Sequence, residues 1–480
     1  MSLGDKIFSG ALWSFFERVS TQAVQFVLGI FLARLLTPKD YGLIGLLLVF
    51  IVISQVFINS GFTKALIQKK NRTAEDISTV FVFNLLISIV CYVLLWFASP
   101  YVADFYEIAE LESMLRVLAL SLILNALFTV PATLVTIELD FKIFAKVNFV
   151  AVLVSGAMAI YFAYQGHGAW SLVYQTLIKA FITGLLLWLW TKWRPEWIFS
   201  KSSFKELFSF GSKLLISSLM NTSVSNVSAL LIAKVINAKE LGYYTQGTQF
   251  TDLIFKTVNS MVEKVLLPGL ANIQDQKEVL IKYSKNIIKI VTIFVAPVFF
   301  ILIVVAEPMI KVLLTEKWLP VVPVMQLFAV ARLITIICGI NVNLLYVLGR
   351  TDLALKQQYI KIPIRLVLLL AALKFGIVYV ALAELLATAI HYFIDSFYPG
   401  KIMDYGSKSQ LKDLYKIVGF NLILGVCTYL LLIPIENDIA KLIVGPLFYA
   451  SCYMLGNYYF KVPEFMGPFK KFIKLLPKKK

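Results

Sequence analysis

Apolar stretches separated by short polar segments follow one another along the whole chain. A membrane-spanning helix needs about 20 mostly apolar residues. The stretches lie near residues 10–33, 42–66, 78–99, 111–136, 147–163, 169–190, 206–233, 242–268, 287–306, 321–348, 362–373, 377–397, 414–434 and 442–460. The eighth, around Tyr243-Tyr-Thr-Gln-Gly-Thr-Gln, is barely hydrophobic, so hydropathy alone predicts one span fewer.

An internal repeat with a shift of 200 residues supports the eighth span. Ten identities fall between residues 24–66 and 224–266. Apolar bias explains matched valines, but it does not explain Lys39 with Lys239, or Gly42 with Gly242. Because the second stretch spans, its counterpart at 242–268 is expected to span as well. Six spans separate the matched positions, and an even number of spans restores the original orientation. The two halves are therefore predicted to be parallel repeats, related by an axis along the membrane normal.

Lysine and arginine are concentrated in alternate loops, and the positive-inside rule orients the chain by them. Fourteen spans place most of these basic residues, including the tail residues Lys478 to Lys480, on the cytoplasmic side together with both termini. Thirteen spans would place the later basic loops outside. The sequence therefore predicts an all-α polytopic membrane protein of 14 transmembrane helices. Its parts are an N-lobe (1–200, helices 1–6), a C-lobe (201–400, helices 7–12), and helices 13–14 with a basic cytoplasmic tail (401–480).

The composition agrees with a membrane protein and excludes several other classes. Of the 480 residues, 59% are hydrophobic and 15% are charged, whereas soluble domains average about 25% charged. The net charge of +17 favours an anionic partner. The two histidines and four scattered cysteines provide no metal-ligand cluster, and no phosphate-binding loop or nucleophile elbow is present. We therefore expect no enzymatic activity, no metal, no cofactor and no nucleic-acid partner.

Charged residues within the predicted spans are candidates for function, because each costs at least about 2.5–3.5 kcal/mol on insertion scales. Arg18, Lys213 and Arg332 lie deepest and are expected to face the bundle interior or water. The other basic candidates are Arg116, Lys179, Lys256 and Arg365; the acidic ones are Glu17, Asp252, Glu384 and Asp395. Basic residues outnumber acidic ones, so a cavity built from these groups would be net positive.

The first and seventh predicted helices carry matching polar faces. Glu17, Arg18, Thr21 and Gln25 share one helical face, and Ser217, Ser218, Asn221 and Ser225 occupy the same positions plus 200. Two such faces meeting across a pseudo-two-fold axis would enclose a hydrophilic cavity. Hydrogen bonds between packed helices are the alternative explanation. Pro131, Pro297 and Pro363 interrupt spans, either as hinges or as inert kinks.

The segment Phe31-Leu-Ala-Arg-Leu-Leu-Thr-Pro-Lys-Asp-Tyr-Gly-Leu, after Gly10-Ala-Leu-Trp, resembles the opening of polysaccharide-transport flippases. These belong to the multidrug/oligosaccharidyl-lipid/polysaccharide exporter superfamily. Ala233-Lys-Val-Ile-Asn-Ala-Lys-Glu-Leu-Gly-Tyr-Tyr resembles the second-lobe counterpart. The resemblance covers nearly the whole chain, although the opening motif is a structural turn and does not read substrate.

The resemblance implies a flippase that moves undecaprenyl-pyrophosphate-linked oligosaccharide repeat units across the bacterial cytoplasmic (inner) membrane, for surface polysaccharides such as lipopolysaccharide. Transport would proceed by alternating access through a central cationic cavity. Arginine suits phosphate through its planar fork. The expected substrate-binding residues are Arg18, Lys213 and Arg332, then Arg116, Lys179, Lys256 and Arg365, with the polar Thr21, Gln25, Asn221 and Ser225. Coupling to a proton or sodium gradient would use Glu17, Asp252, Glu384 or Asp395.

Three alternatives stand beside this interpretation. A drug or small-molecule antiporter of the same superfamily would need a net acidic cavity, which the excess of deep basic residues argues against. A membrane glycan polymerase or ligase would need a large outside loop, and no such loop is expected here. A scaffold for a glycan assembly complex is not excluded. The expected partners are the lipid-linked oligosaccharide, membrane lipids, and a glycan polymerase or other assembly proteins.

Overall fold

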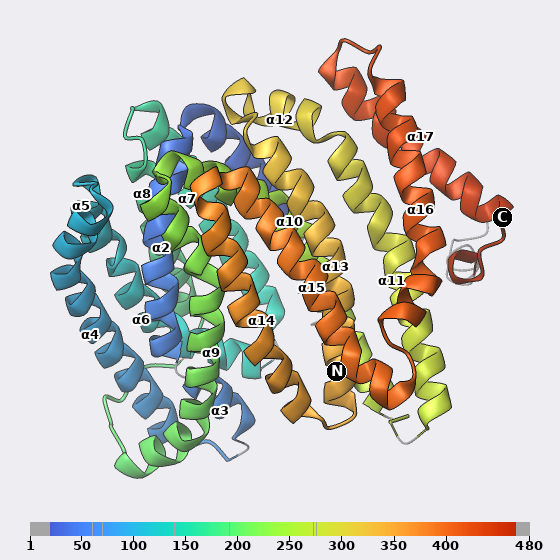
Figure 1. Cartoon of the computed structure of the whole chain (residues 1–480). Helices are drawn as coiled ribbons and strands as arrows, with labels where there is room; N and C mark the ends of the chain where they lie inside the picture. Colours follow the sequence, from blue (N-terminus) through green and yellow to red (C-terminus); the bar gives the residue numbers. More distant parts are fainter. Residues whose placement is uncertain are drawn as a thin grey trace, which may run out of the picture. The chain divides into compact units, whose positions relative to one another are not determined.

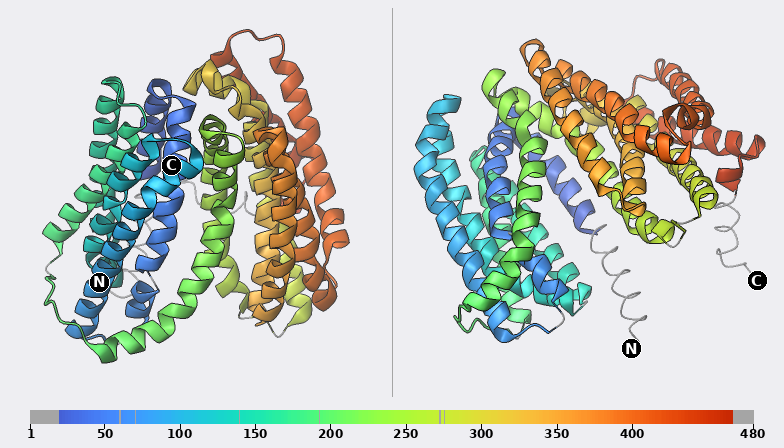
Figure 2. Two further views of the ribbon diagram at one scale, coloured as in Figure 1. Left: turned by 60° about the vertical axis from the view of Figure 1, so that its left-hand side comes forward. Right: turned by 60° about the horizontal axis from the view of Figure 1, so that its bottom comes forward.

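The chain is described by a computed structural model that covers residues 20–466 except 60, 70, 139, 192, 272 and 275. Within these residues the structure is helical and contains no strand, as predicted (Figure 1). The chain packs as two compact units that divide after Gly242. Within each unit, long helices run alongside one another (Figure 2).

In the first unit, the described residues up to 242 form the following helices. They are a helix over Ser20–Leu35, then α2 (Pro38–Asn59), α3 (Phe62–Gln68), α4 (Ala74–Tyr106), α5 (Glu110–Leu118), α6 (Leu120–Ile137), α7 (Phe141–Tyr164), α8 (Trp170–Trp190) and α9 (Lys201–Val235). This unit includes α9, which the repeat assigns to the start of the C-lobe. The lobe boundaries derived from the repeat stay a prediction.

The long helix α10 (Ala238–Ala271) begins in the first unit and continues into the second. The second unit continues with α11 (Lys277–Val304), α12 (Ala306–Leu314), the short η1 (Glu316–Trp318), α13 (Val321–Val347), α14 (Thr351–Ala372), η2 (Leu373–Phe375), α15 (Ile377–Met403), α16 (Ser407–Leu432) and α17 (Asp438–Tyr459).

Ten helices among the described residues are long and apolar enough to cross a membrane. Four predicted spans are not among the ten: 10–33, 206–233, 242–268 and 362–373. The described part of each is nevertheless helical, and α9 and α10 have 35 and 34 residues. At about 1.5 Å per residue these two lengths exceed the roughly 30 Å hydrocarbon core. The protein is therefore an all-α polytopic membrane protein, and the count of fourteen spans stays a prediction.

The repeat-related glycines Gly42 and Gly242 meet in the structure. A Cβ atom on Gly42 would overlap the carbonyl oxygen of Ala238, and one on Gly242 would overlap the carbonyl oxygen of Pro38. Ala238 is Pro38 plus 200, so the contact is reciprocal, as at a two-fold interface. The identity of these two positions is explained by the close approach of the backbones, which leaves no room for a side chain.

Prolines inside two helices of the first unit each leave one backbone carbonyl without its helical donor, and a side chain donates a hydrogen bond to that carbonyl instead. Pro131 in α6 has no N–H to donate to the carbonyl of Leu127, four residues earlier. The indole Nε1 of Trp188 in α8 donates to this oxygen at 3.0 Å. At Pro100 in α4, the Oγ of Ser99 donates to the freed carbonyl of Trp96 at 2.7 Å. In both helices the backbone stays satisfied despite the proline.

The same arrangement joins α17 to α11 in the second unit. Pro297 leaves the carbonyl of Ile293 without its helical donor. The hydroxyl of Tyr453 on α17 donates to that oxygen at 2.7 Å, and Tyr453 is buried. A proline in one helix thus creates a specific docking point for another.

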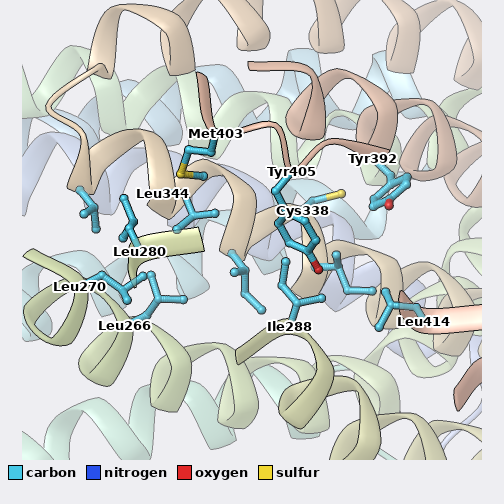
Figure 3. Close-up of a cluster of buried hydrophobic side chains, with 13 residues drawn as sticks. Leu266, Leu270, Leu280, Ile288, Cys338, Leu344, Tyr392, Met403, Tyr405 and Leu414 are labelled. Atoms are coloured by element: carbon cyan, nitrogen blue, oxygen red, sulfur yellow. The ribbon is translucent and has the colours of Figure 1, made fainter. Parts of the chain in front are cut away.

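The core of the second unit is an apolar cluster to which α10, α11, α13, α15 and α16 contribute. The labelled side chains of this cluster converge in Figure 3: Leu266, Leu270, Leu280, Ile288, Cys338, Leu344, Tyr392, Met403, Tyr405 and Leu414. In the first unit, Phe62, Phe81, Val130 and Leu207 form a corresponding cluster between α3, α4, α6 and α9. These clusters fix the helices that carry the polar residues described next.

Candidate functional site

A cavity of about 720 Å³ lies within the first unit. Its walls come from α2, α3, α6 and α9. The lining residues are Ile51, Val52, Gln55, Val56, Asn59, Gly61, Thr63, Asn125, Phe128, Thr129, Ala132, Thr133, Thr136, Leu215 and Ser218. The volume lies within the range of about 300–1,000 Å³ that is usual for small-molecule sites.

Three amide side chains form a row across the α2–α6 side of the cavity. Asn125 Nδ2 lies 3.5 Å from Gln55 Oε1, and Gln55 Nε2 lies 3.5 Å from Asn59 Oδ1. Good N–H···O bonds are near 2.9–3.0 Å, so both contacts are long. Each amide group carries two N–H donors and two acceptor lone pairs, and the described side chains use only a small part of this capacity.

The α6 wall presents hydroxyl groups at a helical spacing. Asn125, Thr129, Thr133 and Thr136 lie on one face of α6. The three threonine hydroxyls donate to the backbone carbonyls four residues earlier, at 2.7–3.0 Å. Because their protons are used in this way, the oxygens face the cavity as hydrogen-bond acceptors.

Gly61 in the cavity lining is in close contact with Gly211 of α9. Gly61 joins α2 to α3 with a left-handed φ of 73°. A Cβ atom there would lie 2.7 Å from the Cα of Gly211 in α9. Glycine at position 61 therefore satisfies both the backbone conformation and the close helix contact, and it divides the predicted span 42–66 into α2 and α3.

The first-helix candidates lie partly outside the described residues. Glu17 and Arg18 are among the residues that the structure does not describe. Thr21 and Gln25 are half-buried on the helix Ser20–Leu35, and the Oγ1 of Thr21 is buried with no hydrogen-bond partner among the described atoms.

The candidates on α9 lie on the described helix. Lys213 belongs to α9, but its side chain is not described. Asn221 and Ser225 are exposed, and the Oγ of Ser225 donates to the Asn221 carbonyl at 2.7 Å. Ser218, on the same predicted polar face, lines the cavity. The polar face of α9 thus contributes one described side chain to the cavity.

Arg332, the third deep basic candidate, is paired with a predicted coupling residue. Its Nε donates to Asp252 Oδ1 at 2.6 Å. The guanidinium also lies 5.3 Å from the ring of Phe255 and 5.2 Å from that of Phe328. The sequence analysis predicts Arg332 as a substrate-binding residue and Asp252 as a coupling residue. In the structure the two form an ion pair that joins α13 to α10.

Two further ion pairs join α14 to α15. Arg365 Nε donates to Glu384 Oε2 at 2.9 Å, and Lys361 Nζ donates to Asp395 Oδ1 at 2.8 Å. Lys361 and Asp395 are both buried. His391 lies between the pairs, with Nε2 3.2 Å from the Lys361 carbonyl.

The predicted span 362–373 begins after Lys361, whereas α14 already begins at Thr351. The lysine lies ten residues into this helix. The nearby Pro399 in α15 frees the Asp395 carbonyl, and Gln357 Nε2 donates to it at 3.3 Å. The α14–α15 contact is therefore polar over several turns.

The remaining basic candidates lie on three different helices. Arg116 in α5 pairs with Glu112 at 2.8 Å and lies over the ring of Trp96 at 4.7 Å. Lys179 is half-buried in α8, and no ion pair is formed by it among the residues that the structure covers. Lys256 is exposed on α10. None of these three is among the cavity-lining residues.

The cavity-lining residues on α2 and α6 are not among the site residues predicted from the sequence. The signal was present, since Gln55 and Asn59 are four residues apart and the α6 residues recur every three or four positions. The predicted polar faces lie only on the first and seventh helices, which begin the repeats. In the described part of the chain no group of three or more His, Cys, Asp or Glu side chains is placed to hold a metal ion.

Comparison with known sequences gives a family. The model of the family described as "Polysaccharide biosynthesis protein" matches residues 31–323. The teichuronic acid biosynthesis protein TuaB of Bacillus subtilis is 27% identical over 356 residues, which is 74% of either chain. The lipopolysaccharide biosynthesis protein WzxC of Escherichia coli is 26% identical over 363 residues, covering 75% of this chain and 74% of that protein. The succinoglycan biosynthesis transport protein ExoT of Rhizobium meliloti is 25% identical over 328 residues (68% and 66%).

Solved structures share the fold at low sequence identity. The lipid II flippase MurJ, in an inward closed conformation, matches with a TM-score of 0.73 at 17% identity, over 95% of this chain and 99% of that one. An inward-facing multidrug resistance transporter of the MATE family matches with a TM-score of 0.61 at 14% identity, over 81% and 96%. These matches establish the fold type of the chain.

Proposed function

Because the chain belongs to the family of polysaccharide biosynthesis proteins, we propose that it is a flippase for lipid-linked oligosaccharides. It moves undecaprenyl-pyrophosphate-linked repeat units from the inner to the outer leaflet of the bacterial cytoplasmic membrane, by alternating access. The family match carries this proposal. The names of the relatives WzxC, TuaB and ExoT support it, as does a fold shared with a lipid flippase.

The described cavity suits transport rather than catalysis. A large polar headgroup crosses a bilayer only where hydrogen-bonding groups replace water. The row of amides and the threonine face provide such groups inside the first unit. We propose a non-enzymatic role on this basis, with both termini in the cytoplasm and a glycan polymerase or other assembly proteins as partners.

The pyrophosphate of the substrate needs positive charge in a region of low dielectric constant. We propose that Arg18 and Lys213, the deep basic candidates on the predicted first and seventh helices, provide it. Both residues belong to the predicted helices that begin the two repeats. The proposed central cationic cavity is thus lined by the first and seventh helices.

The test is leaflet translocation in proteoliposomes. The purified chain is reconstituted with a fluorescent undecaprenyl-pyrophosphate oligosaccharide under a proton gradient, a sodium gradient or no gradient. We expect translocation above that of empty liposomes, and slower translocation by the Arg18→Ala and Lys213→Ala variants. Lys374→Ala is the matched control, because Lys374 is exposed in η2.

Absence of translocation under every gradient, by protein shown to be folded and inserted, would overturn the proposed function. Transport of cationic dyes in place of the glycolipid would favour the drug antiporter. Equal rates for the two variants and the control would overturn the proposed role of Arg18 and Lys213.

A further inference from the structure

The cavity of the first unit has a lining that matches sugar hydroxyls. We propose that it binds neutral sugar residues of the glycan, with Gln55, Asn125 and Thr133 as specificity-determining contacts. This inference rests on the proposed function and assigns one part of the substrate to one set of residues. The lipid and the pyrophosphate bind elsewhere.

The first argument is hydrogen-bond complementarity. A sugar hydroxyl both donates and accepts, so it needs donors and acceptors close together. Gln55 and Asn125 offer N–H donors that their 3.5 Å mutual contact leaves largely free. The oxygens of Thr129 and Thr133 offer acceptors, because their protons are bound to the α6 backbone.

A second, independent observation is an unpartnered hydroxyl in the lining. The Oγ1 of Thr63 is buried and has no hydrogen-bond partner among the described atoms. An unpaired buried hydroxyl costs about 1–3 kcal/mol. A polar ligand in the cavity would remove this cost, whereas an empty or lipid-filled cavity would not.

The apolar part of the lining fits the carbon face of a sugar ring. Phe128 of α6 and Val56 of α2 border the cavity beside the amides. Gly184 of α8 lies against the Phe128 ring and leaves it room. Mixed aromatic and amide walls of this kind contact the C–H groups and the hydroxyls of a sugar at the same time.

The two other parts of the substrate match this lining poorly. None of the described lining residues is charged, so a pyrophosphate there would be a desolvated anion without a counter-charge from them. An undecaprenyl chain would leave the amides of Gln55, Asn59 and Asn125 facing hydrocarbon. Neutral sugar is the component that satisfies both the polar and the apolar walls.

The position of the cavity along the chain agrees with loading from the cytoplasm. From Ile51 to Asn59 the α2 wall rises about 12 Å, and from Asn125 to Thr136 the α6 wall rises about 16 Å. In the predicted topology both helices run toward the cytoplasmic side. The glycan would therefore enter from the leaflet on which it is assembled.

The experiment compares three lipid ligands in nanodiscs. They are undecaprenyl pyrophosphate, the same lipid carrying one N-acetylglucosamine, and the same lipid carrying a neutral tetrasaccharide. The variants are Gln55→Leu, Asn125→Leu and Thr133→Val. The control is Thr176→Val in α8, because Thr176 makes the same bond to the carbonyl four residues earlier, at 2.9 Å, and lies outside the cavity lining.

We expect Gln55→Leu and Asn125→Leu each to weaken binding of the tetrasaccharide lipid about tenfold, which corresponds to about 1.4 kcal/mol. Thr133→Val is expected to weaken it by a smaller factor. Binding of undecaprenyl pyrophosphate is expected to stay within twofold of wild type for every variant. Thermal unfolding of each variant identifies loss of binding that is due to misfolding.

Two results overturn the inference while the proposed function stands. One is wild-type translocation with unchanged binding of all three ligands in the cavity variants. The other is equal weakening of all three ligands in variants that unfold at the wild-type temperature. Failure of the wild-type chain to translocate any of the ligands overturns the proposed function and this inference together.

Discussion

Replacing Tyr453 by phenylalanine removes one hydroxyl from the contact between α17 and α11, and we expect it to destabilise the second unit. The hydroxyl donates to the Ile293 carbonyl at 2.7 Å. That carbonyl has no donor within its own helix, because position 297 is proline. Tyr453→Phe therefore leaves a buried backbone acceptor unpaired.

The expected magnitude follows from two reference values. Hydrogen bonds between membrane helices average about 0.6 kcal/mol, with a maximum near 1.7, because the separated helices find other partners. An unsatisfied buried acceptor costs about 1–3 kcal/mol. The Ile293 carbonyl lacks a helical donor in every state of α11, so we expect a loss of about 1–2 kcal/mol.

The assay is a double-mutant cycle on the free energy of unfolding in mixed micelles. Pro297→Ala restores an N–H that donates to the Ile293 carbonyl, so the loss caused by Tyr453→Phe is expected to fall to near zero in the double variant. The control is Tyr106→Phe in the first unit. The Tyr106 hydroxyl donates at 3.4 Å to the Leu230 carbonyl, and its effect is expected to add to that of Pro297→Ala.

An equal loss from Tyr453→Phe in the proline and alanine backgrounds would refute this reasoning. It would mean that the hydroxyl stabilises α17 by some other contact, and that the carbonyl freed by Pro297 is satisfied without it. A change in oligomeric state in either background would be seen by size-exclusion chromatography and separated from unfolding.

Two further substitutions test the polar pair and the glycine junction. Asp395→Asn leaves the Lys361 ammonium buried without its carboxylate. We expect it to lower the free energy of unfolding by about 3–5 kcal/mol. The control is Asp352→Asn in the exposed pair with Arg350, for which we expect a loss of at most about 1 kcal/mol. Equal losses would contradict the structural role, and loss of transport at unchanged stability would instead make Asp395 a coupling residue. Gly61→Ala places a Cβ atom against α9 and requires alanine in a left-handed backbone conformation. We therefore expect a lower unfolding temperature and slower transport. Wild-type values for both would show that the backbone between α2 and α3 can accommodate a side chain.

Hydropathy and the repeat predicted the helical elements well because both reflect local properties. An apolar stretch bordered by polar residues becomes a helix in lipid whatever surrounds it. The weak eighth stretch is a continuous helix in the structure, and the repeat and the distribution of basic loops indicated it where hydropathy did not. The Gly42–Gly242 identity was visible in the sequence, but the reason for it, a reciprocal backbone contact, is a tertiary feature.

The sequence also determined which residues are charged, and it placed the chain in its family. It did not determine which charges meet. Arg332 with Asp252, Arg365 with Glu384 and Lys361 with Asp395 are separated by 80, 19 and 34 residues, and their pairing depends on how neighbouring helices rotate and shift. The same holds for the cavity, because a polar face becomes a binding wall only when other helices leave space in front of it.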